Sequence, residues 1–194
     1  MDNTVGSLTQ QQKSVIIGCV LGDGYLRIIP GRKDAFLEVN HSIKAKEYVD
    51  WKYSILKSIC ISAPKRRKID EKRIGYRFFT RQHPEITKLY EKFYSQGRKV
   101  IPAGFKLNPL SLAVWFMDDG SKNKKGDVYL NCQQFDFQSQ RRLLHSLRTI
   151  GVRARMNKDK KYYRIRIRRE SISRFVELIK PYIIPSMEYK IAGL

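Results

Sequence analysis

The sequence predicts an α+β protein built from two related halves. Two apolar segments end in the same dipeptide, Asp-Gly, and their closing acids, Asp23 and Asp119, lie about half a chain length apart. After each motif, strand-like and helix-like segments follow in the same order. These observations predict two pseudo-twofold-related αββαββα repeats, at residues 1–97 and 98–194. We expect one compact unit with the motif helices at a shared interface and two antiparallel, saddle-shaped sheets.

The first half begins with a short helix at Ser14–Gly24, which Gly24 is expected to end in a left-handed conformation. Period-two alternation beside turn residues predicts two hairpins, and apolar residues at helical spacing predict two more helices. In chain order these are strands Tyr25–Ile29 and Phe36–Ser42, helix Glu47–Ile59, strands Lys65–Ile69 and Arg73–Thr80, and helix Pro84–Ser95. A loop is expected at Gln96–Asn108.

The second half repeats this order after a motif helix that ends at Asp119. The elements expected are strand Val128–Phe135, helix Ser139–Ile150, the hairpin of Val152–Asn157 and Tyr162–Arg168, and helix Ser171–Tyr182. Ser171 is expected to cap the last helix.

The charge balance points to a polyanionic partner. The net charge is +21, while 42% of the residues are hydrophobic, which is enough for a folded core. A surface this positive attracts nucleic acid. An anionic membrane surface is disfavoured as the partner, because the basic residues alternate along strand-like segments and do not lie on one face of an amphipathic helix. The longest apolar runs are too short to cross a bilayer.

Cysteine and histidine usage excludes several kinds of site. The three cysteines are far apart without a Cys-x-x-Cys pair, and the three histidines are equally dispersed. This favours a reducing compartment and argues against a zinc or HNH-type centre. The first residues lack the layout of a signal or transit peptide. We therefore expect the protein to act where it is synthesised, in an organelle (mitochondrion or chloroplast) or in a prokaryotic cytoplasm.

The two motif acids are candidates for a metal centre. Each lies at a helix C-terminus, whose partial negative charge disfavours an acid by about 0.3–1 kcal/mol unless a cation is bound. Carboxylate oxygens suit magnesium. Gly18 and Gly22, spaced i, i+4, leave one helix stripe without side chains, and Ala113 is small, so the two motif helices could approach closely. An Asp-Gly pair alone is an ordinary helix-end turn; the second copy and the net charge favour function.

Both motifs resemble the LAGLIDADG motif of homing endonucleases, and Leu112–Gly120 is the stronger match. The resemblance extends over residues 12–192 and is to the monomeric, two-motif enzymes of mobile introns. It implies that Asp23 and Asp119, with Gly22 and Asp118 beside them, hold two or three magnesium ions at the scissile phosphates. Asp118 has no counterpart in the first motif and is also interpreted as a solvent-facing or structural acid. Manganese is expected to replace magnesium, and calcium to bind without cleavage. No obligate protein partner is expected.

The resemblance also implies further catalytic groups. A basic residue near the end of each repeat reaches the active site in this family, and Lys99 and Lys190 fit that role. A polar residue at the end of the second strand holds a metal-bound water. The candidates are Asn40, His41 or Ser42 in the first half, and Gln133 or Asn157 in the second.

Polar, arginine-rich faces of the predicted strands suit the major groove of DNA, where arginine reads guanine and asparagine or glutamine reads adenine. Loop lysines would bind phosphates. The DNA-contact candidates are Arg27, Glu38, Asn40, Arg73, Arg77, Tyr129, Asn131, Gln133, Arg153, Arg155, Arg164, Arg166, Arg168, Lys122 and Lys160.

The function expected is site-specific double-strand DNA cleavage in intron homing. One phosphodiester of each strand would be hydrolysed across the minor groove of a long, asymmetric target, leaving 3′ overhangs. Two alternatives share the fold. One is an RNA maturase that binds its host intron, and the other is a non-catalytic DNA-binding regulator. The paired acids and lysines favour cleavage.

Overall fold

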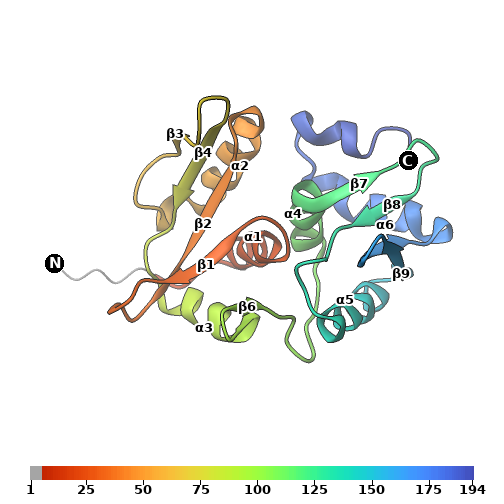
Figure 1. Cartoon of the computed structure of the whole chain (residues 1–194), viewed down its shortest axis with the longest axis horizontal. Helices are drawn as coiled ribbons and strands as arrows, with labels where there is room; N and C mark the ends of the chain where they lie inside the picture. Colours follow the sequence, from red (N-terminus) through yellow and green to blue (C-terminus); the bar gives the residue numbers. More distant parts are fainter. Residues whose placement is uncertain (1–5) are drawn as a thin grey trace. The chain divides into compact units, whose positions relative to one another are not determined.

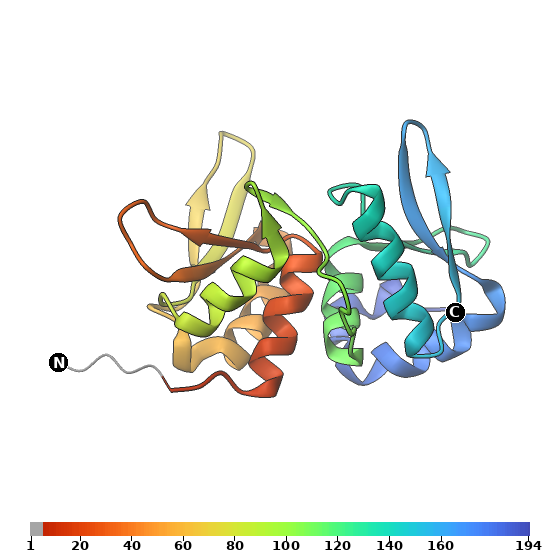
Figure 2. The same cartoon turned by 90° about the horizontal axis from the view of Figure 1, so that it is seen from below.

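The computed structural model describes residues 6–194 and divides the chain into two compact units, with the boundary between Glu91 and Lys92. Each unit contains a four-stranded antiparallel sheet and three α-helices. The helices cover one face of each sheet and leave the other face open (Figures 1 and 2). The predicted α+β class is therefore confirmed.

The first unit has the strand order β1-β2-β4-β3. Its strands are β1 Tyr25–Ile28, β2 Ala35–Ser42, β3 Lys65–Lys68 and β4 Ile74–Phe79. Its helices are α1 Gln10–Leu21, α2 Lys46–Leu56 and α3 Pro84–Phe93, the last of which continues across the unit boundary.

The second unit has the matching order β7-β8-β10-β9. Its strands are β7 Gly120–Lys122, β8 Val128–Leu130, β9 Ala154–Asp159 and β10 Tyr162–Ile167, and its helices are α4 Pro109–Asp119, α5 Phe137–Thr149 and α6 Ile172–Ile179. Because both sheets place the hairpins in the same order around a motif helix, the sheet topologies support an internal duplication.

Local signals explain where the motif helices begin. Thr9 and Gln12 form a capping box at the start of α1, which satisfies two backbone donors that have no partner within the helix. At α4, Asn108 accepts a hydrogen bond from the backbone of Ser111, and Pro109 occupies the first turn. Along α4, every residue from Leu110 to Met117 is buried. A helix that is apolar all round is a core helix, so both its position and its end are tightly fixed.

Alternation explains the two faces of the sheets. In β2 the odd-numbered residues Ala35, Leu37 and Val39 are buried, while the alternating residues Glu38 and Asn40 are less buried and lie on the open face. Such alternation is typical of an antiparallel sheet with one covered face.

Several short elements differ from the sequence expectation. The predicted strand Val128–Phe135 ends at Leu130, so Gln133 lies in a turn. The predicted loop Gln96–Asn108 begins with a hairpin of β5 Tyr94–Ser95 and β6 Arg98–Lys99, and β7 was not predicted. Strands of two or three residues are too short to display periodicity.

Ser171 holds the position before α6, but its side chain does not cap the helix. Its hydroxyl accepts a hydrogen bond of 3.0 Å from the backbone N–H of Arg153 instead. The hydroxyl therefore fixes the start of the β9 hairpin against the following helix.

Among residues 6–194, no helix is long and apolar enough to span a bilayer.

Candidate functional site

Asp23 occupies a tight turn directly after α1. The backbone N–H of Gly22 donates to the carbonyl oxygen of Gly18 at 3.1 Å, and that of Gly24 donates to the carbonyl oxygen of Cys19 at 2.7 Å. These two bonds hold the backbone on both sides of the acid, while its side chain is 48% exposed. The turn therefore presents a carboxylate to solvent on a fixed backbone.

At both motifs the acid is followed by a glycine because there is no room for a larger residue. A Cβ added at Gly24 would lie 2.6 Å from Cys19 Cβ, and one added at Gly120 would lie 2.0 Å from Phe116 Cδ2. Gly24 does not adopt a left-handed conformation, which corrects the expectation from the sequence, and Gly120 has φ −77°. In both units the chain turns back so closely on its own helix that a side chain does not fit.

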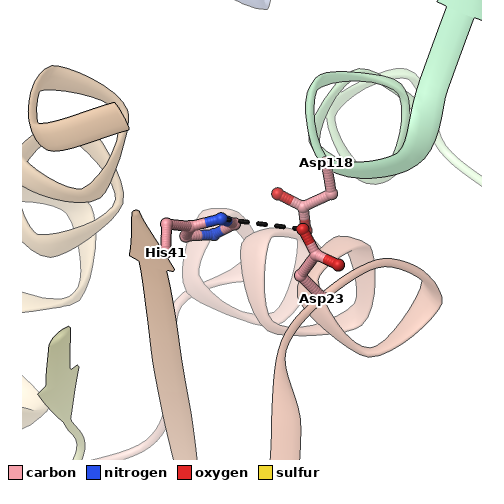
Figure 3. A group of neighbouring side chains, drawn as sticks. All are labelled: Asp23, His41 and Asp118. Carbon is pink, nitrogen blue, oxygen red and sulfur yellow. Dashed lines mark ion pairs between the residues drawn. The ribbon is translucent and has the colours of Figure 1, made fainter. Parts of the chain in front are cut away.

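His41 places an imidazole beside the first acid. It comes from β2, and its Nδ1 lies 3.6 Å from Asp23 Oδ2 (Figure 3). Its Nε2 lies 3.1 Å from the ammonium nitrogen of Lys52 in α2. The His41 side chain is only 10% exposed. Of the three water-positioning candidates near the end of β2, His41 is the one that the structure brings to the acid.

Lys52 escaped the sequence analysis. Its side chain is completely buried in α2, and its ammonium nitrogen lies 4.1 Å from the centre of the Tyr48 ring. The signal was present, because Lys52 lies three residues after Val49 and four before Leu56, on the buried face of the helix. A lysine on a core face is rare enough to indicate a specific role.

The second motif acid lies in a different setting. Asp118 and Asp119 form the end of α4, and both are partly buried. The backbone carbonyl of Asp119 accepts a hydrogen bond of 3.3 Å from the N–H of Asn131, just after β8. Trp115 also donates its indole N–H to the carbonyl of Asn131 at 3.3 Å. The helix end is thereby attached to the sheet of its own unit.

Lys190 caps the C-terminus of α4. Its ammonium nitrogen lies 3.2 Å from the carbonyl oxygen of Phe116, 2.5 Å from that of Met117, 3.4 Å from that of Asp118 and 3.1 Å from that of Gly120. The carbonyls of Met117 and Asp118 belong to the last turn, where a helix leaves carbonyls without intrahelical partners at its negative end. Lys190 therefore supplies positive charge to the backbone that carries Asp119.

The other candidate lysine, Lys99, has a different environment. It belongs to the β5–β6 hairpin, within the second unit, and donates to Gln134 Oε1 at 3.2 Å on the surface. Lys99 and Lys190, which occupy matching positions in the two repeats of the sequence, are thus held by different contacts.

The remaining candidates for holding a water have other environments. The Ser42 hydroxyl caps the short turn after β2 by accepting from the N–H of Lys44, and Gln133 is exposed in the turn that follows β8. The Asn157 amide donates to the carbonyl of Lys158 in β9. Within residues 6–194, Asn40 Oδ1 is buried without a hydrogen-bond partner.

The open face of the first sheet carries an arginine–glutamate cluster. Glu38 lies 3.0 Å from Arg27 and 4.0 Å from Arg77. Arg73, by contrast, belongs to the β3–β4 turn, where it pairs with Asp70 at 2.5 Å. Glu38 therefore neutralises part of the charge on this face and holds two arginines in place.

The open face of the second sheet is organised by Asp127. Arg166 donates to this carboxylate at 2.5 Å, and Arg169 lies 3.6 Å away. The Arg166 hydrogen bond, followed by that of Asn123, lowers the pKa of Asp127. Because the folded-state pKa is lowered, the stabilisation is present at neutral pH and is lost as the pH falls below the ordinary value of 3.8.

Tyr129 differs from the expectation that it faces DNA. Its side chain is buried, with only 8% exposed, because the guanidinium of Arg164 lies 3.9 Å above its ring. Arg164 also lies 3.6 Å from Asp159. Tyr129 thus orients an arginine and offers little surface of its own.

The other DNA-contact candidates occupy the edges and loops of the second unit. Arg155 and Lys160 are exposed on the β9–β10 hairpin, and Arg168 is exposed just after it. Arg153 lies 3.8 Å from Glu170, and Lys122 donates to the backbone carbonyl of Ala192.

Comparison with known proteins places this arrangement in a family. The model of the LAGLIDADG DNA endonuclease family matches residues 13–175. The chain is 30% identical over 201 residues to the probable intron-encoded endonuclease 1 of Wickerhamomyces canadensis, covering 95% of this chain and 85% of that protein. Among solved structures, it is similar to the homing endonuclease I-WcaI bound to its DNA recognition sequence. The TM-score is 0.86, with 28% identity over 96% of this chain and 88% of that chain.

A second relative is an mRNA maturase. The chain is 30% identical over 211 residues to the cytochrome b mRNA maturase bI2 of Saccharomyces cerevisiae. That alignment covers 100% of this chain but 50% of the maturase, so the chain spans half the length of this relative.

Proposed function

Because the chain belongs to the LAGLIDADG DNA endonuclease family, we propose that it is a site-specific endonuclease that cuts both strands of a long, asymmetric DNA site. The observation that carries the proposal is the repeated motif end. In both units the motif helix is followed or ended by an acid, and the next residue is a glycine that cannot be replaced without a clash. Each acid would serve one scissile phosphate of the DNA.

The donor set of the motif acids fits divalent metal ions. Asp23 presents a half-exposed carboxylate, and Asp118 and Asp119 add two more at the end of α4. Oxygen ligands of this kind suit magnesium, with manganese as a substitute. Bound magnesium would supply a hydroxide nucleophile and stabilise the leaving oxygen. In this proposal, Asp23 and Asp119 hold the ions with help from Gly22 and Asp118, and calcium binds without supporting cleavage.

Other side chains would prepare the site for the reaction. Lys190 fixes the helix end that carries Asp119, and His41 faces Asp23. Lys99 would approach the scissile phosphate as a mobile cation, because its present partner lies at the surface. The products would be 5′ phosphates and 3′ hydroxyls on 3′ extensions.

The open sheet faces would read the target sequence. Arg77 and Arg166 lie on these faces, and each is already oriented by an acid, Glu38 or Asp127. An arginine held in one direction loses less conformational freedom when it binds a base edge. The exposed Arg155 and Lys160 would bind phosphates at the flanks. We expect a monomer that acts in the compartment of its synthesis.

RNA maturation is the second candidate, and the relationship to the yeast maturase favours it. The two functions make different demands on the acids. Cleavage requires them, whereas RNA binding through the basic faces does not.

A cleavage selection tests the proposal directly. The protein is incubated with a randomised duplex library and magnesium, and the cut ends are sequenced. We expect enrichment of one site in the wild-type reaction and none for a variant with Asp23→Asn and Asp119→Asn. Equal enrichment by the variant would contradict the assignment. Tight binding of intron RNA without any DNA cleavage would favour the maturase.

A further inference from the structure

The side chain of Lys52 is completely buried in the first unit. Charged groups lose several kcal/mol when they are removed from water, so a lysine with no exposed surface is costly unless something requires it. The contact with the Tyr48 ring offsets a part of this cost. A hydrophobic residue would fill the same position at lower cost.

The second unit shows that the fold does not need this charge. Helix α5 follows β8 as α2 follows β2, and the four buried residues of α2 match four of the five buried residues of α5 in spacing. Tyr48, Val49, Lys52 and Leu56 in α2 correspond to Ser139, Gln140, Leu143 and Leu147 in α5. Lys52 therefore occupies the place of a leucine, Leu143. The difference between the units lies in chemistry that only the first one has.

That chemistry is a directed contact with the imidazole of His41. In its ammonium form Lys52 carries hydrogen-bond donors only, so the His41 Nε2 at 3.1 Å then accepts from it. The proton of the neutral ring then resides on Nδ1, the nitrogen that faces Asp23 at 3.6 Å (Figure 3). Lys52 thus selects one tautomer and one ring orientation. An imidazole without this partner could turn its acceptor nitrogen toward the carboxylate.

We propose that Lys52 is a positioning residue for the first half of the cleavage site, acting through His41 on the carboxylate of Asp23. The inference rests on the proposed endonuclease function. When a residue that orients a metal ligand is replaced, the metal affinity or the activity typically falls by about 10–100-fold. Because the second unit has Leu143 at the matching position, the loss should affect only the strand that Asp23 serves.

The test is strand-resolved cleavage of a supercoiled plasmid carrying the selected site. Lys52→Met keeps the length and burial of the side chain and removes its donors. We expect one strand to be cut about 10–100-fold more slowly, with nicked circles accumulating and unchanged DNA affinity. Lys52→Gln, whose amide can still donate, should recover most of the lost rate. Leu143→Met, the matched core change in the second unit, should leave the ratio of the two strand rates as in the wild type.

A double-mutant cycle identifies the route of the effect. His41→Phe keeps the aromatic contact with Tyr48 and removes both ring nitrogens. If Lys52 acts through His41, Lys52→Met causes no further loss in the His41→Phe background. Additive losses, or equal slowing of both strands, would overturn the inference. Wild-type protein that cuts neither strand would instead overturn the proposed endonuclease function.

A measurement on the unmodified protein covers the case in which Lys52→Met does not fold. Nitrogen-15 chemical shifts of the His41 ring at pH 8 distinguish the tautomers directly. We expect a protonated Nδ1 and an unprotonated Nε2. A protonated Nε2 would overturn the inference whether or not DNA is cleaved.

Discussion

Replacing Lys190 with methionine should destabilise the second unit even in the absence of DNA. The ammonium group lies within 3.4 Å of four carbonyl oxygens at the C-terminus of α4. Lys190→Met keeps the length of the side chain but leaves these carbonyls without their charged donor. The motif helix would then lose its cap at the turn that carries Asp119.

The size of the effect follows from two terms. A hydrogen bond to a charged group contributes about 1.5–3 kcal/mol, and a cation at a partly buried helix C-terminus contributes up to about 2 kcal/mol. The two terms describe the same contacts and do not add, so we expect a loss of about 2–3 kcal/mol. For a chain of this length, 1 kcal/mol corresponds to about 2–4 °C, which gives a fall in Tm of about 4–12 °C.

Thermal unfolding followed by circular dichroism measures this shift, and Lys99→Met is the matched control. Lys99 donates to Gln134 at the surface, so its replacement should cost no more than about 0.5 kcal/mol. The reasoning would be refuted if the Tm of Lys190→Met lay within about 1 °C of the wild-type Tm. A Tm no lower than that of Lys99→Met would also refute it.

Three further predictions follow from particular contacts. Gly120→Ala should lower the free energy of unfolding by about 1–3 kcal/mol, because the new methyl group would lie 2.0 Å from Phe116 Cδ2. Gly6→Ala is the control and should leave the Tm unchanged, because an added Cβ there has no neighbour within 4 Å. Equal Tm values for the two variants would contradict this prediction. Burial raises the pKa of the Cys60 and Cys132 thiols to about 12, so neither thiol should react with a thiol reagent at pH 8 until the protein unfolds. The contribution of these thiols to stability should be lost as the pH rises from 9.0 toward 12. Rapid labelling of either thiol in the native protein would count against this prediction. DNA affinity should fall with salt at a log–log slope of about −0.9 per phosphate neutralised, and a flat titration would exclude an extended DNA interface.

The sequence was sufficient for the elements whose patterns are long enough to read. The alternation in Phe36–Ser42 and the helical spacing in Pro84–Ser95 predicted β2 and α3, and the two Asp-Gly motifs predicted the repeated order. Each of these patterns extends over several side chains on a buried face. A strand such as β7, with three residues, shows no such pattern and was missed.

The chemistry of the site was harder to predict, because it depends on contacts between residues far apart in sequence. The sequence indicated that Lys190 was important, but not that its ammonium group would contact carbonyls 70 to 74 positions earlier in the chain. Lys52 was overlooked because lysine is normally exposed. The role of Gly24 was assigned to backbone conformation, whereas the close approach of Cys19 requires it.

The most direct test of the central claim is to map both cleavage positions on the selected DNA for the wild type, Asp23→Asn and Asp119→Asn. We predict that the wild type with magnesium breaks both strands at staggered positions and leaves 3′ extensions. Each substitution should abolish double-strand breaks while DNA binding is retained. Double-strand cleavage at the wild-type rate by either variant would contradict the assignment of one motif acid to each half of the site.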